Sequence, residues 1–521
     1  MHNPRSTEPS SAPPDSNGSL GTFGAATVVA LAWLIGFVPA LCAPLLGLPA
    51  AAAIAAAISI VAGFLVPERA LAGVALALIP TSLAVSSQLV PLDGRYLPMA
   101  AVAGTLLIGV FRLARRGQVH AKVPPTSVFL ALVAYLAWAV VAALTSIDRA
   151  TSLIYLGGAA GVFLIAFVLV PTAVAEEVWT RRMLATVAAT AGGLVVSDIL
   201  LSTSGPITLF GEHVGLYQIA EILVAGTPTT LVVPRAMGPF PVPADAALAL
   251  ALGLVALLAL RRDAGSRARK LGDLTILFVA AGLLLTMARS GWLVAAIATG
   301  LYAALVLIRG RLDRAAVLVA AVFGAACILL SFNVLGARLR HDIEVSRYGP
   351  ELTAPIPGAD SEQFRGGMDL SGRPLIWDAS LDAIRARPVV GWGPGTNAQA
   401  IAPYLTGEAA RFRGLTSHNT WLRAAVELGL PGLAAFVAFG LASAAVVFRR
   451  RRVLAGERDR AGPAFIAIAG GIVAWQAVES LTLGGLSYPG FIWILSIGAL
   501  VTVSATTVRP WRPRDASDAV S

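Results

Sequence analysis

The chain has 521 residues, of which 57% are hydrophobic and only 13% are charged, and its formal net charge is +10. A soluble domain carries roughly 25% charged residues, so this composition excludes an ordinary soluble enzyme. Apolar runs recur along the chain at about 17 to 25 residues, which is enough to cross ~30 Å of hydrocarbon as a helix. Because a lipid-exposed backbone must satisfy its own hydrogen bonds, the runs predict transmembrane helices. The alternating pattern of a membrane barrel is missing.

The N-terminal residues 1–22 are rich in Pro, Ser, Asn and Gly, with Arg5 as their one basic residue. This composition predicts a disordered tail and not a signal peptide. Cys42 and Cys327 both lie inside apolar runs, which predicts neither a disulfide nor a metal site.

We predict an all-α, polytopic transmembrane bundle of about fourteen spans. The spans are expected near residues 24–42, 48–66, 70–90, 97–113, 126–144, 152–171, 183–202, 245–260, 271–287, 290–308, 314–332, 431–448, 463–482 and 486–507. The predicted organisation is a tail (1–22), a bundle of eleven spans with an outer segment at 203–244 (23–332), a large extracytoplasmic loop with amphipathic helices (333–430), three last spans (431–508) and a second tail (509–521).

Lysine and arginine in short loops predict the orientation. The basic loops at 112–122, 261–270, 309–314 and 449–460 all face the cytoplasm if both termini are cytoplasmic. The protein is then a multi-pass protein of the plasma (inner) membrane. Its positive charge serves as anchoring against anionic lipid and does not indicate nucleic-acid binding.

The same topology places the segments 203–244 and 333–430 outside, together with the short link around Ala288–Ser290. Residues 333–370 are turn-rich and suggest no function. From Ser371 onward, Trp377, Leu381 and Ile384 recur at helical spacing, which predicts an amphipathic helix lying on the membrane or over the bundle. Arg387-Pro388 ends this helix, and GWGPG at 391–395 predicts a tight loop.

Arg373 stands at the start of that helix, where backbone N–H groups favour an anion and a guanidinium adds a two-pronged donor for phosphate. The alternative is a solvated cap residue. His418 is expected to open the next helix, with Ser417 or Thr416 as its cap. A helix N-terminus disfavours imidazolium, so a neutral His418 suits a general base. The alternative is a polar interfacial side chain.

Four further polar residues lie near the outer ends of spans. Arg289 falls between two spans almost without a loop, where its alternative role is snorkelling to the interface. Arg235 lies in a proline-rich loop, and its alternative role is an ordinary loop cation. Asp198 and Glu479 are supporting candidates that can orient arginines or meet interfacial water. Three cations and one neutral base on one membrane face suit a diphosphate leaving group and a hydroxyl acceptor.

Several of these runs carry a family resemblance. The SGR-x-x-x-W run at 371–377, RPVVGWGPG at 387–395, HNTWL at 418–422 and ELGLPG at 427–432 resemble the signature region of the O-antigen ligase and polymerase family. TMARSGW at 286–292 and RAMGPF at 235–240 resemble two shorter elements of that family, in the same order. The family often has an asparagine a few residues after the second element, whereas this chain has PVPADAA.

The resemblance implies an integral membrane glycosyltransferase of the all-helical, GT-C-like type that needs no metal and no cofactor. Such proteins take a glycan from undecaprenyl diphosphate on the outer face and transfer it to a hydroxyl of a glycan, a lipid or a protein. By the same resemblance His418 is the catalytic base, and Arg289 and Arg235 bind the diphosphate. Arg373 matches a further motif arginine, and Asn419 is a supporting residue beside the histidine. No Asp-rich cluster in the outer segments argues for a metal.

Two alternatives remain open at this point. A polymerase joining lipid-linked repeat units would use the same residues, and two sizeable outer segments favour it slightly, whereas the motif set favours a ligase. A transporter of lipid-linked oligosaccharide is more remote, because it predicts charged residues along a path through mid-membrane. Here the middles of the spans are almost free of charge.

Overall fold

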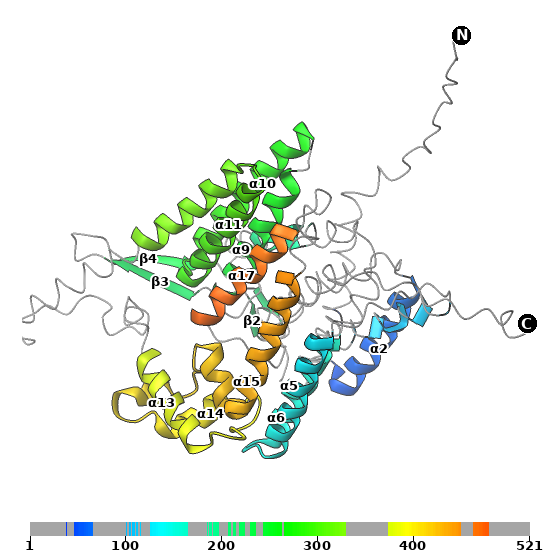
Figure 1. The fold of residues 1–521 in the computed structure, drawn as a ribbon, viewed down its shortest axis with the longest axis vertical. Coiled ribbons are helices and arrows are strands. Elements are labelled where there is room, and N and C mark those ends of the chain that lie inside the picture. Colours follow the sequence, from blue (N-terminus) through cyan, green and yellow to red (C-terminus); the bar gives the residue numbers. More distant parts are fainter. Residues whose placement is uncertain are drawn as a thin grey trace, which may run out of the picture.

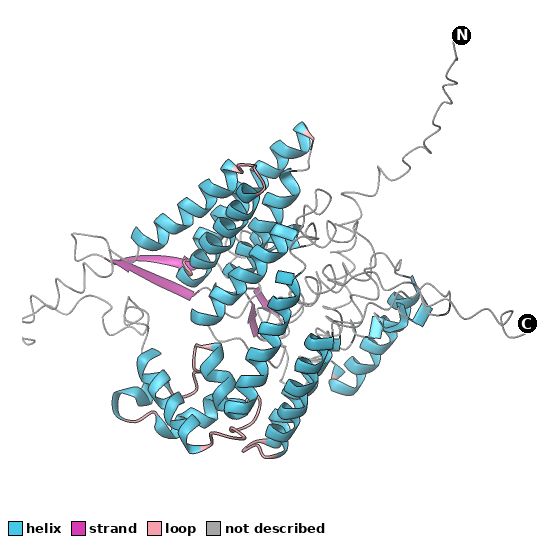
Figure 2. Cartoon of the chain, viewed as in Figure 1, coloured by secondary structure: helices cyan, strands magenta, loops and turns pink. Residues whose placement is uncertain are grey.

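The computed structural model describes part of the chain in detail. The described residues are 46–65, 126–164, 243–262, 265–329, 373–449 and 462–478, four strands between 207 and 235, and scattered helical residues at 38, 101–115 and 185–196. The predicted tails and the segment 333–370 lie outside them. The described chain is mostly helical, as predicted (Figure 2).

The helices follow the apolar runs closely. Their bounds are α2 Leu48–Leu65, α5 Thr126–Leu144, α6 Arg149–Leu164, α9 Pro243–Arg262, α10 Ser266–Leu285, α11 Arg289–Ile308, α13 Arg373–Ala386, α14 Asn397–Ile401, α15 Thr420–Arg449 and α17 Gly462–Val478. Short 3₁₀ turns, η3 Ala402–Tyr404 and η4 Gly407–Phe412, follow α14, and a further apolar helix covers Arg314–Leu329.

Within the described residues, four helices are long and apolar enough to cross a membrane: α5, α9, α11 and α15 over Thr420–Val446. This finding fits a membrane protein. The count of fourteen spans and the sidedness of the termini remain predictions, because many of the expected spans fall outside the described part of the chain.

The segment 203–244 contains strands that the all-α prediction did not include. Strand β1 (Ile207–Leu209) pairs antiparallel with β2 (Glu212–Val214), and β3 (Gln218–Leu223) pairs antiparallel with β4 (Thr230–Arg235). The run TLVVPR of β4 is rich in β-branched residues, which favour strands. The run is also too short to give a membrane-span signal, so an analysis based on span length overlooked it.

The main core is a cluster in which α9 packs against α10, α11 and α17 (Figure 1). Nearly every side chain of α9 from Ala246 onward is buried. Small residues allow this close approach: a Cβ on Gly291 of α11 would collide with Ala247 near the start of α9. The N-terminal ends of α9 and α11 therefore lie side by side.

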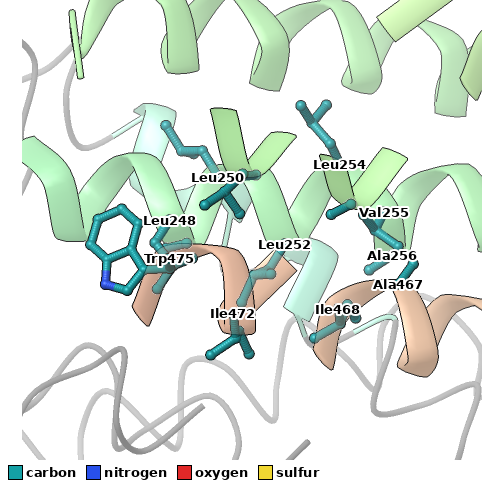
Figure 3. Packing of buried hydrophobic residues seen from close by; sticks show 14 of the residues in the cluster. Leu248, Leu250, Leu252, Leu254, Val255, Ala256, Ala467, Ile468, Ile472 and Trp475 are labelled. Atoms are coloured by element: carbon teal, nitrogen blue, oxygen red, sulfur yellow. The ribbon is translucent and has the colours of Figure 1, made fainter. Parts of the chain in front are cut away.

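Helix α17 runs opposite to α9 and α11. Figure 3 shows Trp475 and Ile472 of α17 pointing toward Leu248 and Leu252 of α9. Gly471 of α17 fits against α11, where an added Cβ would come within 2.9 Å of Ala298. The C-terminal end of α17 therefore meets the N-terminal ends of α9 and α11.

A second, smaller core holds α13, α14 and the two 3₁₀ turns against the start of α15 (Figure 1). The buried face of α13 consists of Ile376, Ala379, Ser380, Ala383 and Ile384. The predicted amphipathic helix is thus confirmed and lies over the bundle, but its predicted apolar stripe is wrong at Leu381, which is 40% exposed. Alanines and a serine, which carry little hydropathy signal, occupy the buried positions instead.

Candidate functional site

Helix α15 begins two residues later than the sequence predicts. Its first residue is Thr420, and the Asn419 side chain accepts hydrogen bonds from the backbone N–H groups of Trp421 (2.9 Å) and Leu422 (3.1 Å). Asn419 is therefore the helix cap, and the prediction that Ser417 or Thr416 caps the helix is wrong. Asn and Ser cap equally well, so the choice depends on what else Ser417 binds.

His418 precedes this cap and has a strained backbone. Its φ is 44°, and Met287, two residues before Arg289, has a φ of 49°. Among the described residues these are the only non-glycine residues with positive φ. Strain of this kind costs of order 1–3 kcal/mol and collects at functional sites. One strained position is therefore the candidate base His418 itself, and the other lies two residues before the candidate Arg289.

Ser417, on the other side of His418, is held by α13 and α14. The indole N–H of Trp377 donates to the Ser417 carbonyl at 2.9 Å. The Ser417 N–H donates to Oδ1 of Asn397 at 2.8 Å, and its hydroxyl contacts Asn397 Oδ1 (3.0 Å) and Ser380 Oγ (2.9 Å). Sequence reasoning missed Asn397 and Ser380, because neither belongs to a local motif with the histidine.

The GWGPG loop and the ELGLPG run form one structural unit. Helix α15 is interrupted at Gly429 (φ 71°, ψ 180°), two residues before Pro431. The N–H groups of Trp392 and Gly393 donate to the carbonyls of Val426 and Glu427 at 2.9 Å each. These bonds satisfy carbonyl groups that a broken helix leaves free. The glycine loop thus fixes the C-terminal end of the short helix that His418 precedes.

The same loop also binds the α5–α6 turn. The Ile147 N–H donates to the Trp392 carbonyl at 3.2 Å, and the Ser152 hydroxyl donates to the Pro394 carbonyl at 2.9 Å. Helix α5 contributes Trp138, whose indole donates to the Leu428 carbonyl at 2.8 Å. The turn 145–148 and the loop 387–396, which belongs to the segment predicted to lie outside, are therefore found together at one end of the bundle.

Arg289 and Arg373 are brought near each other from the starts of α11 and α13. Both side chains are partly buried, and they lie close enough for their positive charges to repel. The Arg289 carbonyl also lies 3.8 Å from the Cys327 sulfur. Since α13 carries Trp377 one turn after Arg373, the two arginines and the His418 segment occupy the same end of the molecule.

The structure gives less information about the other three candidates, Arg235, Glu479 and Asp198. Arg235 ends β4, where its backbone pairs with Gln218, shortly before α9 begins at Pro243. The chain from Arg235 thus leads to the same end of the α9–α11–α17 cluster from which Arg289 starts. Glu479 directly follows the last residue of α17, and both Glu479 and Asp198 lie outside the described residues.

A buried ion pair in α15 was also missed. Nε of Arg423 lies 2.8 Å from Oε1 of Glu427, and both side chains are almost inaccessible, at 8% and 7% exposure. The signal was present in the sequence, because opposite charges four residues apart in an otherwise apolar helix form a pair on one helix face. In the described part of the chain, no three His, Cys, Asp or Glu side chains gather as metal ligands.

Comparison with known families gives one match. A family model described as O-Antigen ligase matches residues 274–437. The match contains Arg289, Arg373, the glycine loop, His418 and the break at Gly429. No curated protein matches the chain closely enough to serve as a relative.

Proposed function

We propose that this chain is a membrane glycosyltransferase. The proposal starts from its membership of the O-antigen ligase family, whose model matches residues 274–437. In this proposal it transfers a glycan from undecaprenyl diphosphate to an acceptor hydroxyl on the extracytoplasmic face of the plasma membrane. The acceptor hydroxyl belongs to a glycan, a lipid or a protein. The reaction inverts the anomeric centre and uses neither metal nor cofactor.

The proposed chemical step is a single displacement. The imidazole of His418 takes the proton of the acceptor hydroxyl while the oxygen attacks the sugar C1. The new C1–O bond forms as the bond from C1 to the diphosphate oxygen breaks. Arg289, Arg235 and Arg373 then stabilise the negative charge that develops on the leaving diphosphate. Arginine suits this role because its planar fork binds two phosphate oxygens at once.

The observation that carries the proposal is that Arg373 begins α13, whose Trp377 donates to the carbonyl of Ser417, directly before His418. Arg289, at the start of α11, lies within range of the charge of Arg373, and an anion with several oxygens suits two guanidinium groups. The positive φ of His418 adds support, since a strained residue is kept where its conformation is needed.

Replacing His418 tests its proposed role as the general base. Because His418 has positive φ, His418→Ala adds backbone strain, whereas Asn tolerates that conformation. Both His418→Ala and His418→Asn are expected to abolish glycan transfer in purified protein while leaving membrane insertion intact. The loss expected from a missing general base is about 10²- to 10⁴-fold. Full activity of His418→Asn would exclude His418 as the base.

Replacing the arginines tests the diphosphate site. Arg289→Lys and Arg235→Lys keep the charge and lose the fork, so each is expected to weaken use of the donor, with a higher KM for the lipid diphosphate. Arg385→Lys is the matched control. Arg385 lies on α13 like Arg373, but it is 75% exposed and pairs with Asp382 at 2.7 Å. Equal effects of all three variants would contradict a specific diphosphate site.

The lipid-linked glycans of cells that carry His418→Asn distinguish the two reactions. Accumulation of full-length lipid-linked polymer would indicate a ligase. Accumulation of single lipid-linked repeat units would indicate a polymerase, the alternative that the same residues serve.

A further inference from the structure

All polar groups of Ser417, the residue before His418, form hydrogen bonds within the protein. Its N–H, its hydroxyl and its carbonyl are all hydrogen-bonded to Trp377, Ser380 and Asn397. Ser417, Ser380 and Asn397 are each 0% exposed. We call Trp377, Ser380 and Asn397 together the Ser417 clamp. It joins α13 and α14 to the chain directly before the histidine.

The backbone that follows His418 in the sequence is also held by hydrogen bonds. Asn419 caps α15 through two backbone N–H groups, and α15 is anchored further along by the glycine loop. His418 therefore lies between two residues whose backbones cannot rotate independently. Its left-handed conformation, with φ 44°, follows from this arrangement, because the chain must turn between the clamp and the cap.

Asn397 is the member of the Ser417 clamp whose side-chain orientation is determined by its hydrogen bond. Its Oδ1 accepts from the Ser417 N–H, a group that can only donate, so the orientation of the amide is determined. Within the described part of the chain, Nδ2 of Asn397 is buried with no hydrogen-bond partner. Leaving a buried donor without a partner destabilises the fold. A residue that served only for packing would be apolar here, so the amide is kept for its oxygen.

We propose that Asn397 is a positioning residue for His418. Its side-chain oxygen holds Ser417 and so maintains the strained backbone that aims the imidazole at the acceptor hydroxyl, with Ser380 and Trp377 in support. Asn397 itself is buried and does not touch substrate. This inference rests on the proposed role of His418 as the base, and it extends the site to α14, which no motif in the sequence analysis reaches.

The test uses purified full-length protein and a lipid-diphosphate glycan donor. Asn397→Leu removes the acceptor oxygen, so the imidazole loses its alignment. A displacement of about 1 Å at a reacting group costs roughly 10²-fold in rate, so kcat is expected to fall by about that factor while the KM for the donor stays unchanged. Asn397→Asp keeps an oxygen facing Ser417 and is expected to recover most of the rate.

A pair of serine variants separates positioning from mere packing. Ser380 and Ser443 are both buried and both donate to the carbonyl four residues earlier, at 2.7 Å and 2.8 Å. Only Ser380 also contacts Ser417. Ser380→Ala is expected to lower kcat about fivefold, as for the loss of one hydrogen bond in the active geometry. Ser443→Ala is expected to leave kcat unchanged.

The outcomes distinguish this inference from the proposed function. If His418→Asn is inactive but Asn397→Leu keeps the full rate, the positioning role is wrong and the base remains. If Asn397→Leu and Asn397→Asp lose activity equally, or if the loss appears in the donor KM and not in kcat, the positioning role is also wrong. If His418→Asn is fully active, the proposed function itself fails.

Discussion

The arginines at the two ends of the helical bundle have different charged neighbours. At the end where α9 finishes, Arg261 forms an ion pair with Asp273 of α10 and lies 3.8 Å from Asp313. At the other end, Arg289 at the start of α11 lies toward a second arginine, Arg373. The first end pairs its cation with carboxylates of the same chain. The second end places two arginines within range of each other's charge.

In the proposed function, this difference distinguishes a structural arginine, Arg261, from arginines that bind the leaving diphosphate. A cation that serves the fold is given an internal anion, since burying charge without compensation is costly. Cations held near one another destabilise the fold slightly and favour an anion from outside, which is how a binding site differs from a scaffold. Measuring both the stability and the transfer activity of each variant tests this distinction.

The largest effect on stability is expected for the buried pair in α15. Arg423 and Glu427 are 8% and 7% exposed, so Glu427→Gln removes the carboxylate from a desolvated guanidinium. Breaking such a pair costs about 3–5 kcal/mol, measured as thermal or chemical unfolding in detergent. The double variant Arg423→Met with Glu427→Leu is expected to lose less, because no charge then remains buried. Equal losses would mean that packing, and not charge, governs this position.

The second effect concerns the break in α15. A Cβ on Gly429 would collide with the Val389 carbonyl, and its φ is 71°. Gly429→Ala combines a left-handed conformation with overpacking, so about 2 to 4 kcal/mol of unfolding free energy should be lost. Gly440→Ala is the control, because this glycine in the second half of α15 has no atom within 4 Å of an added Cβ. It is expected to be neutral or slightly stabilising. A neutral Gly429→Ala would refute the docking of the glycine loop.

A smaller effect is expected for the ion pair at the end of α9, and it compares the two ends directly. The Asp273 side chain is 43% exposed, so Asp273→Asn should cost at most about 1 kcal/mol and leave transfer unchanged. Arg289→Gln should show the reverse, a large loss of transfer with stability unchanged or raised, since it relieves the repulsion from Arg373. If Arg289→Gln unfolds the protein as Glu427→Gln does, Arg289 is structural.

The sequence predicts the helices well because hydrocarbon thickness dictates their length. The run predicted at 126–144 coincides with α5 at Thr126–Leu144. Charge and hydropathy are local properties, so they are readable without a fold. The hairpins between 207 and 235 were missed because short strands gain their stability from pairing, which depends on residues elsewhere in the chain.

The site was predictable only where a residue carries charge or a motif. Arg289, Arg373 and His418 stand out against apolar surroundings, whereas Asn397 lies in an unremarkable GTNAQ run. The positioning role proposed for Asn397 depends on Ser417, twenty positions away, and this contact exists only after α13 and α14 pack on α15. The same contact explains the wrong helix cap, because Ser417 is bound to Asn397 and leaves the cap to Asn419.

The smallest effect is expected for Asp148, in the turn that contacts the glycine loop. Hydrogen bonds from the Thr151 hydroxyl and N–H lower the pKa of the half-buried Asp148 carboxyl. A lowered pKa in the folded state means that the carboxylate stabilises the fold above the unfolded pKa of about 3.9, and that this contribution disappears as the pH falls through the folded value. The melting temperature of the wild type should therefore exceed that of Asp148→Asn by an amount that is constant above about pH 5 and shrinks toward about pH 3. Thr151→Val, which removes one of the two bonds, should shift this loss to higher pH. A difference that stays constant down to pH 3 would mean that the turn is held by its contacts with Trp392 and Pro394 and not by the charge of Asp148.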